Sequence, residues 1–188
     1  MNTDHWESWQ RDYLRGLILI LPPDEVSGPI DALRQRYDPR SAASCGAHIS
    51  LSDPLNVEMS EARAEEVCRI LRRIEPFTLR YGKPRASPLR AGVSCPVTPQ
   101  EPVDALKAAL HTASVYASEP YGRRDIPAHM TIAEFISIER SLELGAQLHG
   151  NGPSGTFLCD RLTHVVPDVD FCFQSVRTFF LGRGPDPA

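Results

Sequence analysis

The chain lacks the marks of a metal-binding, disulfide-linked or membrane-spanning protein. Its five cysteines are odd in number and widely separated, and none forms a Cys-x-x-Cys pair. We therefore expect reduced, mostly buried thiols in a cytoplasmic protein, and no zinc site. The one long apolar run, Gly16–Pro22, is too short to cross a bilayer, and Pro23 and Asp24 follow it instead of a small-residue cleavage site. This run predicts a buried central strand and no association with membranes.

Positive charge is also scarce. The 188 residues carry a net charge of −4 and the sequence pI is near 5.9, a balance that argues against a broad electrostatic grip on long duplex nucleic acid. A small phosphate, or the end of an RNA, needs only a few local cations. With 41% hydrophobic and 23% charged residues, the composition is that of an ordinary globular protein, and we expect residues 1–188 to form one domain.

Two short apolar runs share one pattern, a histidine followed two residues later by a hydroxyl residue. The first holds His48 and Ser50, and the second holds His129 and Thr131. Successive side chains of a β-strand point to opposite faces, so the imidazole and the hydroxyl of each run point the same way and the intervening apolar residues point the other. The pattern predicts two half-buried strands that each contribute half of a site.

The predicted elements repeat in order around these motifs: helix, histidine strand, helix, strand, strand. In the first half they are a helix at 24–37 broken or delayed by Gly28-Pro29, a polar loop from Ser41 to Gly46, a strand that runs to Leu51, a helix capped by Ser60, and strands 77–81 and 91–97. In the second half they are helix 102–117, strand 128–135, helix 137–148, and strands 155–166 and 171–182. We expect an α+β fold, a two-lobed, pseudo-two-fold duplicated domain with antiparallel strands lining a central cleft and helices outside. The lobes would form from approximate repeats at 24–98 and 101–183, after an N-terminal helical extension at 1–15.

Two imidazoles on opposite sides of one cleft suit in-line displacement at phosphorus. One takes a proton from the attacking water or hydroxyl while the other gives a proton to the departing oxygen, and both work best with a pKa near neutrality. Ser50 and Thr131 can donate hydrogen bonds to the non-bridging phosphate oxygens as charge accumulates. This scheme requires no metal and no other cofactor.

The segments His48–Leu51 and His129–Ile132 resemble the paired His-x-Ser/Thr-x signatures of the 2H phosphoesterase superfamily, which includes the 2′-5′ RNA ligase-like proteins and the RNA 2′,3′-cyclic phosphodiesterases. The resemblance covers the whole chain in size, motif separation and element order. It implies metal-independent hydrolysis of phosphodiesters, with the two histidines as catalytic acid and base and the two hydroxyl residues as phosphate ligands. It also implies a small nucleotide or RNA terminus as substrate, such as a 2′,3′-cyclic phosphate, and favours His129 as the base.

Further substrate contacts are expected from the loop that leads into the second motif. Arg123 and Arg124 are candidates for phosphate binding, and Tyr121 for stacking on a base. Lys83 and Arg85 are weaker candidates for the same phosphate contacts. A solvated turn is the alternative interpretation of the loop arginines.

Other functions stay open from the sequence. A non-catalytic nucleotide-binding module would keep the cleft, and an RNA end-processing or ligase-like factor would predict a basic rim. Shortly after their second motif, bacterial 2′-5′ RNA ligase-like proteins often have an arginine, whereas this chain has Glu134 in that region. An acidic residue there weakens the case for the RNA-end substrate of those proteins. Oligomeric state is not encoded in any pattern we recognise.

Two smaller features have two interpretations each. Cys45, three residues before His48, fits either a Cys/His nucleophile or a buried structural thiol. Trp6, Trp9 and Tyr13 are spaced like one face of a short helix, which either packs on the domain or forms a lid that stacks on a base.

Overall fold

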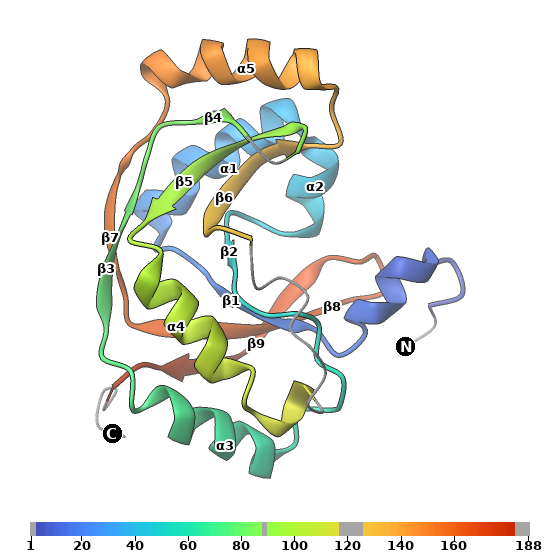
Figure 1. The fold of residues 1–188 in the computed structure, drawn as a ribbon. Helices are drawn as coiled ribbons and strands as arrows, with labels where there is room; N and C mark the ends of the chain where they lie inside the picture. Colours follow the sequence, from blue (N-terminus) through green and yellow to red (C-terminus); the bar gives the residue numbers. More distant parts are fainter. Residues whose placement is uncertain (1–2, 88–89, 117–125, 183–188) are drawn as a thin grey trace.

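Two antiparallel sheets organise the chain. The computed structural model describes residues 3–87, 90–116 and 126–182. Its strands are β1 (Leu17–Ile20), β2 (Ile49–Ser50), β3 (Phe77–Tyr81), β4 (Arg85–Ala86), β5 (Gly92–Thr98), β6 (His129–Glu134), β7 (Gly155–Cys159), β8 (Arg161–Pro167) and β9 (Phe173–Phe180). One sheet has the order β2-β1-β8-β9, and the other has the order β4-β5-β3-β7 with β6 paired to β5 (Figure 1).

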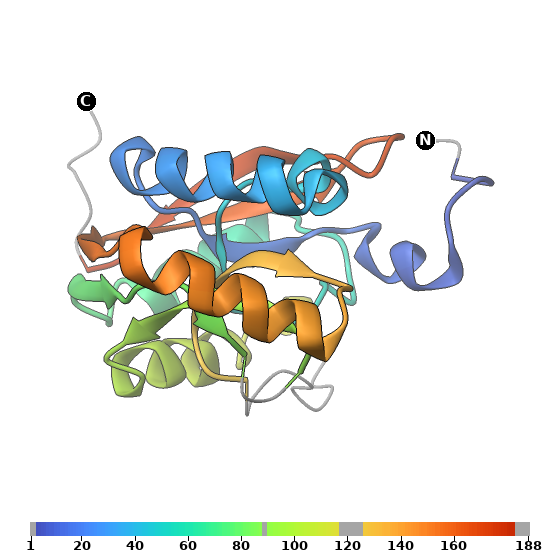
Figure 2. The same ribbon diagram turned by 90° about the horizontal axis from the view of Figure 1, so that it is seen from above.

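Helices cover the outer faces of these sheets. They are α1 (Asp24–Tyr37), α2 (Pro39–Ser44), α3 (Glu61–Leu71), α4 (Glu101–Leu110) and α5 (Ile138–Asn151), with the 3-10 helices η1 (Ser8–Tyr13) and η2 (Ser114–Tyr116). Helix α1 packs against β6, helix α5 against β4 and β5, and α3 against both α4 and β9 (Figures 1 and 2). Among the described residues, no helix has the length and apolar character needed to cross a bilayer.

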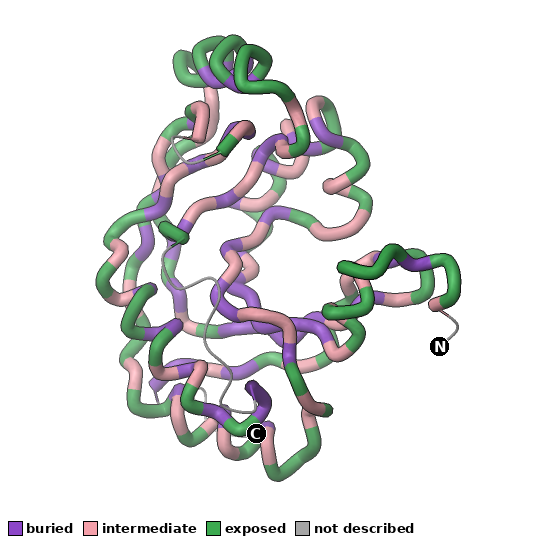
Figure 3. Tube along the Cα trace, turned by 45° about the vertical axis from the view of Figure 1, so that its right-hand side comes forward, coloured by how far each residue is buried: buried purple, intermediate pink, exposed green. Residues whose placement is uncertain are grey.

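The predicted α+β fold with antiparallel strands and outer helices is confirmed, and so is the alternation in the histidine strands. Ile49, Leu51, Met130 and Ile132 are fully buried in the core shared by both sheets, whereas the histidine and hydroxyl positions between them are only half-buried. Buried positions gather in the interior of the molecule, and the outer sides of the helices are mostly exposed (Figure 3). The apolar run near residue 18 forms β1, whose four residues are all buried between β2 and β8. Burial of one strand face therefore leaves the other face of each motif for a site.

The strands of the two predicted repeats are interleaved. β1 and β2 from the first part of the chain pair in one sheet with β8 and β9 from the end, while β6 and β7 join β3, β4 and β5 in the other. Each sheet thus combines strands of both 24–98 and 101–183, so neither stretch builds a lobe by itself.

Two predictions around helix α1 were wrong. The helix is not broken at Gly28-Pro29 but runs through Pro29, because the carbonyl that this proline leaves unbonded belongs to Glu25 in the exposed first turn. The segment from Ser41, expected as a loop, belongs to helix α2. Asp38 caps that helix by accepting a hydrogen bond from the Ser41 amide at 3.1 Å.

Three other boundaries differ from the prediction. The strand expected at 155–166 is divided at Asp160 into β7 and β8, which belong to different sheets. The helix expected at 102–117 ends at Leu110, where His111 caps it and stacks on Tyr116 at 4.3 Å between ring centroids. The helix expected in the N-terminal extension at 1–15 covers six residues, Ser8–Tyr13, and is of the 3-10 type. The Ser60 cap of α3 is confirmed, since its hydroxyl accepts from the Arg63 amide.

Candidate active site

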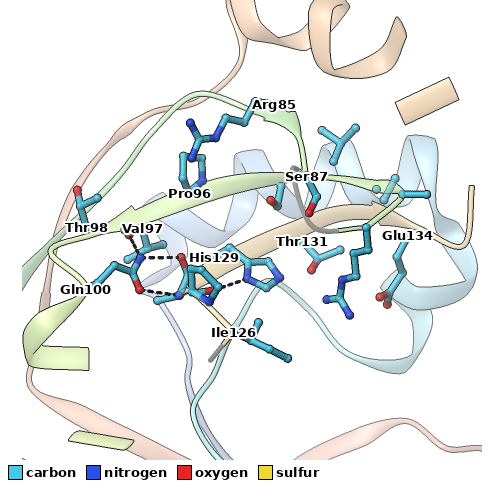
Figure 4. A pocket seen from close by; sticks show the side chains of 18 residues that line it. Arg85, Ser87, Pro96, Val97, Thr98, Gln100, Ile126, His129, Thr131 and Glu134 are labelled. Carbon is cyan, nitrogen blue, oxygen red and sulfur yellow. Dashed lines mark hydrogen bonds between the residues drawn. The ribbon is translucent and has the colours of Figure 1, made fainter. Parts of the chain in front are cut away.

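A single cleft of about 690 Å³ is lined by all four motif residues. His48 and Ser50 reach it from β2 and its entrance, and His129 and Thr131 reach it from β6. A second cavity of about 310 Å³ shares His129 and Thr131 with the first and continues on the other side along β5 (Figure 4). Residues far apart in sequence and in different sheets are therefore brought to one site.

The two histidines are held in the same way. The Nδ1 atom of His48 lies 2.7 Å from the Gly46 carbonyl oxygen, and Nδ1 of His129 lies 2.7 Å from that of Pro127. A carbonyl can only accept, so each Nδ1 carries the proton and donates it, and the neutral ring has its basic lone pair on Nε2. The site thus has two imidazoles with matching tautomers.

The backbone just before each histidine is also fixed in a matching way. The Ala47 amide donates to Oδ1 of Asp31 at 2.6 Å, and the Ala128 amide donates to Oε1 of Gln100 at 2.8 Å. Asp31 lies on α1 and Gln100 caps α4, so in each case a side chain from a helix earlier in the chain holds the strand entrance (Figure 4 shows Gln100). This correspondence is the local form of the predicted pseudo-two-fold.

Burial lowers the pKa of His129. The hydrogen bond to the Pro127 carbonyl opposes that effect, the positive charge of Arg90 adds to it, and the carboxylate of Glu134 opposes it again. The net direction is downward from the ordinary 6.5, so His129 is neutral at pH 7 and able to accept a proton.

One buried arginine joins the two motifs. Arg34 on α1 is 2% exposed, and its guanidinium donates to the carbonyl of Thr131 at 2.8 Å and to that of Cys45 at 2.7 Å, with a longer bond of 3.2 Å to Ser41. Thr131 belongs to the second motif, and Cys45 lies just ahead of the first. The sequence analysis missed this residue, although it continues the buried stripe formed by Val26 and Ile30 at four-residue spacing. A charged residue on an apolar helix stripe was the signal.

Cationic side chains line the cleft despite the net negative charge of the chain. Among the described residues these are Arg34, Arg40 and Arg90, and the acidic residues at the same surface are Glu7 and Glu134. Arg40 Nη2 lies 3.5 Å from Glu7 Oε1 in an exposed ion pair. The cleft can therefore offer local positive charge to a phosphate without a basic protein surface.

The other predicted substrate contacts do not share one location. Tyr121, Arg123 and Arg124 lie outside the described residues, so their role stays a prediction. Arg85 lines the smaller cavity (Figure 4), whereas Lys83 donates to the Gly150 carbonyl at the end of α5 and is not among the residues that line either cavity.

The thiol of Cys45 is unsuited to nucleophilic attack. It lines the cleft, but burial raises its pKa to about 11, an effect that the nearby Arg34 guanidinium only partly offsets. The thiol form is inert compared with the thiolate, so the structural interpretation of Cys45 is favoured. Among residues 3–87, 90–116 and 126–182, no group of three histidine, cysteine or acidic side chains is arranged to hold a metal ion.

Solved structures share this fold, and one known protein is similar in sequence. A relative from Oceanobacillus iheyensis named "Putative phosphoesterase" is 24% identical over 170 residues, which is 88% of this chain and 97% of the relative. Among solved structures, Escherichia coli LigT in complex with 3′-AMP is 16% identical with a TM-score of 0.58, covering 89% of this chain and 98% of that one. The protein TT0787 of Thermus thermophilus is 12% identical with a TM-score of 0.53 and covers 89% and 98%.

The sequence itself settles the family. The pattern that defines the 2′-5′ RNA ligase superfamily matches residues 22–170, which contain both histidine motifs, every strand of the sheet that holds β6, and β2 and β8 of the other sheet. The resemblance drawn from the two motifs is thereby confirmed, and the chain belongs to the 2′-5′ RNA ligase superfamily of 2H phosphoesterases.

Proposed function

We propose that this phosphoesterase-family protein is a cyclic phosphodiesterase that hydrolyses 2′,3′-cyclic phosphates of nucleotides or RNA ends without a metal ion. One observation carries the proposal: two histidines with the same tautomer, each next to a hydroxyl residue on its own strand, line a single cleft. An acid and a base placed on rigid strands are what an in-line displacement at phosphorus requires.

The proposed reaction runs in one displacement. The reactive state has His129 neutral and His48 as the imidazolium, with protons on both of its ring nitrogens. Nε2 of His129 takes a proton from water as its oxygen forms a bond to phosphorus, and Nε2 of His48 gives its proton to the ribose oxygen whose bond to phosphorus breaks. Ser50 and Thr131 donate hydrogen bonds to the non-bridging oxygens, where negative charge increases. The product is a ribose monophosphate ester with a free neighbouring hydroxyl, and the two histidines have exchanged protonation states.

Two further facts support this assignment of roles and substrate. The pKa of His129 is lowered, which favours the unprotonated form that a base needs. The Escherichia coli LigT structures that share this fold include complexes with 3′-AMP, ATP and NADP+. A nucleotide phosphate fits the arginines that line the cleft here.

A panel of esters tests the proposal directly. Chelator-treated protein is incubated with nucleoside 2′,3′-cyclic phosphates, 2′-5′-linked oligonucleotides and 3′,5′-cyclic nucleotides, and the products are separated by chromatography. We expect metal-free conversion of a 2′,3′-cyclic phosphate to a monophosphate. Binding without turnover of any ester would instead identify a nucleotide-binding module, and joining of RNA ends would identify a ligase-like factor.

The pH dependence of this reaction provides a second test. A base works only when unprotonated, so kcat/KM falls as the pH drops through the pKa of His129. Because burial holds that pKa below 6.5, we expect the midpoint of the acid limb below pH 6.5. Arg90→Gln removes a positive charge that lowers the same pKa, and we expect it to move the midpoint upward. A wild-type midpoint at or above 6.5 would contradict the lowered pKa of His129, and an unchanged midpoint in Arg90→Gln would contradict the assignment of the acid limb to His129.

A further inference from the structure

Aromatic rings form one wall of the cleft that contains the two histidines. Trp9 and Tyr13 come from η1, and Phe171 and Phe173 come from the turn and strand that follow β8. The described ring pairs of this cluster all meet edge to face, with centroid separations of 5.2 to 6.2 Å and interplanar angles of 72° to 88°. Edge-to-face packing fixes the rings against one another without stacking them in parallel.

The wall is firmly attached to the fold. Trp6 is 4% exposed, and its indole nitrogen donates to the Val169 carbonyl at 2.8 Å, which fastens the N-terminal segment to the turn between β8 and β9. Trp9, three residues on, is 45% exposed, and its indole nitrogen donates to Glu7 at 2.8 Å. The first tryptophan thus packs on the domain, while the second presents a large ring surface at the cleft.

Backbone strain also concentrates at the cleft. Among the described residues other than glycine, only Phe135 and Phe171 have positive φ angles, 57° and 60°. Both line this cleft, and Phe135 is 86% exposed at the end of β6. A bulky residue rarely adopts this conformation, which persists mainly at active sites and ligand-binding positions.

We propose that this aromatic wall is the nucleobase subsite of the cleft, with the exposed ring of Trp9 as its main stacking surface and the buried ring of Phe171 holding Trp9 in place edge to face. The inference rests on the proposed function, which puts the phosphorus between the two histidines. The base of the same nucleotide then lies toward the wall, because cleft and wall are one continuous surface. A planar heterocycle stacks on aromatic rings, whereas an aliphatic group gains only burial. Trp9 and Tyr13 precede residues 22–170, so this part of the wall lies outside the family pattern.

Calorimetric titration with adenosine 2′-monophosphate, and separately with inorganic phosphate, tests this subsite. We expect Trp9→Leu to weaken nucleotide binding by about 10-fold, within the range for loss of one base stack, and to leave phosphate binding unchanged. Trp9→Phe keeps an aromatic ring and should lose about 3-fold or less. Leu14→Ala is the matched control, because Leu14 is 41% exposed on the same segment and is not among the residues that line the cleft; its affinities should equal those of the wild type.

Measurements of binding and of turnover distinguish the nucleobase subsite from the proposed cyclic phosphodiesterase activity. A selective loss of nucleotide binding in Trp9→Leu supports the nucleobase subsite whether or not any ester is hydrolysed. Absence of hydrolysis would contradict only the proposed cyclic phosphodiesterase activity. Equal losses for nucleotide and inorganic phosphate, no loss for either, or no nucleotide binding by the wild type would each overturn the subsite.

Discussion

Replacing either cleft histidine by alanine is expected to lower kcat for a 2′,3′-cyclic phosphate by about 10²-fold or more. His48 and His129 line the same cleft with Nδ1 held by a backbone carbonyl, so alanine removes the only ring nitrogen positioned to move a proton on that side. The double variant should lose little more than the worse single variant, because acid and base act in one step. Steady-state kinetics on chelator-treated protein measures these losses.

A matched control variant and a substrate with a different leaving group test the roles of the two histidines separately. His149→Ala should keep the wild-type kcat, because His149 is exposed on α5 with Nδ1 3.2 Å from the Pro84 carbonyl and does not line the cleft. A nucleoside p-nitrophenyl phosphate has a leaving group that departs without a proton. It should restore much of the rate of His48→Ala but not that of His129→Ala. Wild-type kcat in either alanine variant would remove that histidine from the mechanism.

Replacing Arg34 by methionine is expected to damage stability and activity together. The guanidinium bonds the carbonyls of Thr131, Cys45 and Ser41, and hydrogen bonds to a charged group contribute about 1.5–3 kcal/mol each. Solvent at the cleft can replace part of that loss, so we expect the free energy of unfolding to fall by about 3 kcal/mol. We also expect kcat/KM to fall by about 10²-fold, because displacement of a catalytic group by about 1 Å costs that much.

Denaturant unfolding and kinetics at low temperature separate these two effects. Arg36→Met is the matched control, since Arg36 is exposed two residues further along α1 and lies 5.2 Å from the ring centroid of Tyr37. Its stability should change by less than about 1 kcal/mol, with activity unchanged. Arg34→Lys keeps the charge but cannot bond three carbonyls at once, so an intermediate loss is expected. Folded Arg34→Met with wild-type kcat/KM would show that the arginine does not position the motifs.

The burial pattern of the site could be predicted from the sequence because it depends on local geometry. Alternation alone indicates that Ile49 and Met130 are buried while His48 and His129 face a cleft, and the structure agrees. A side-chain cap at Ser60 is equally local, and it also agrees. Such signals need only the neighbours along the chain.

What the sequence did not reveal depends on distant partners. Nothing around Asp160 marks the point where the chain passes from one sheet to the other, because apolar residues continue on both sides of it. The aromatic wall joins Trp9 to Phe171, which are brought together only by the docking of the N-terminal segment. The Asp38 cap, by contrast, was a readable local signal for α2 that the sequence analysis passed over.

The interleaved sheets have a consequence for the protein during its synthesis. Both histidine motifs leave the ribosome well before β8 and β9, yet β1 pairs with β8 along the edge opposite β2. Until residues 161–180 emerge, one side of this apolar strand has no partner, and such an edge invites aggregation. We therefore expect the nascent chain to be prone to aggregation along this edge until β8 pairs with β1.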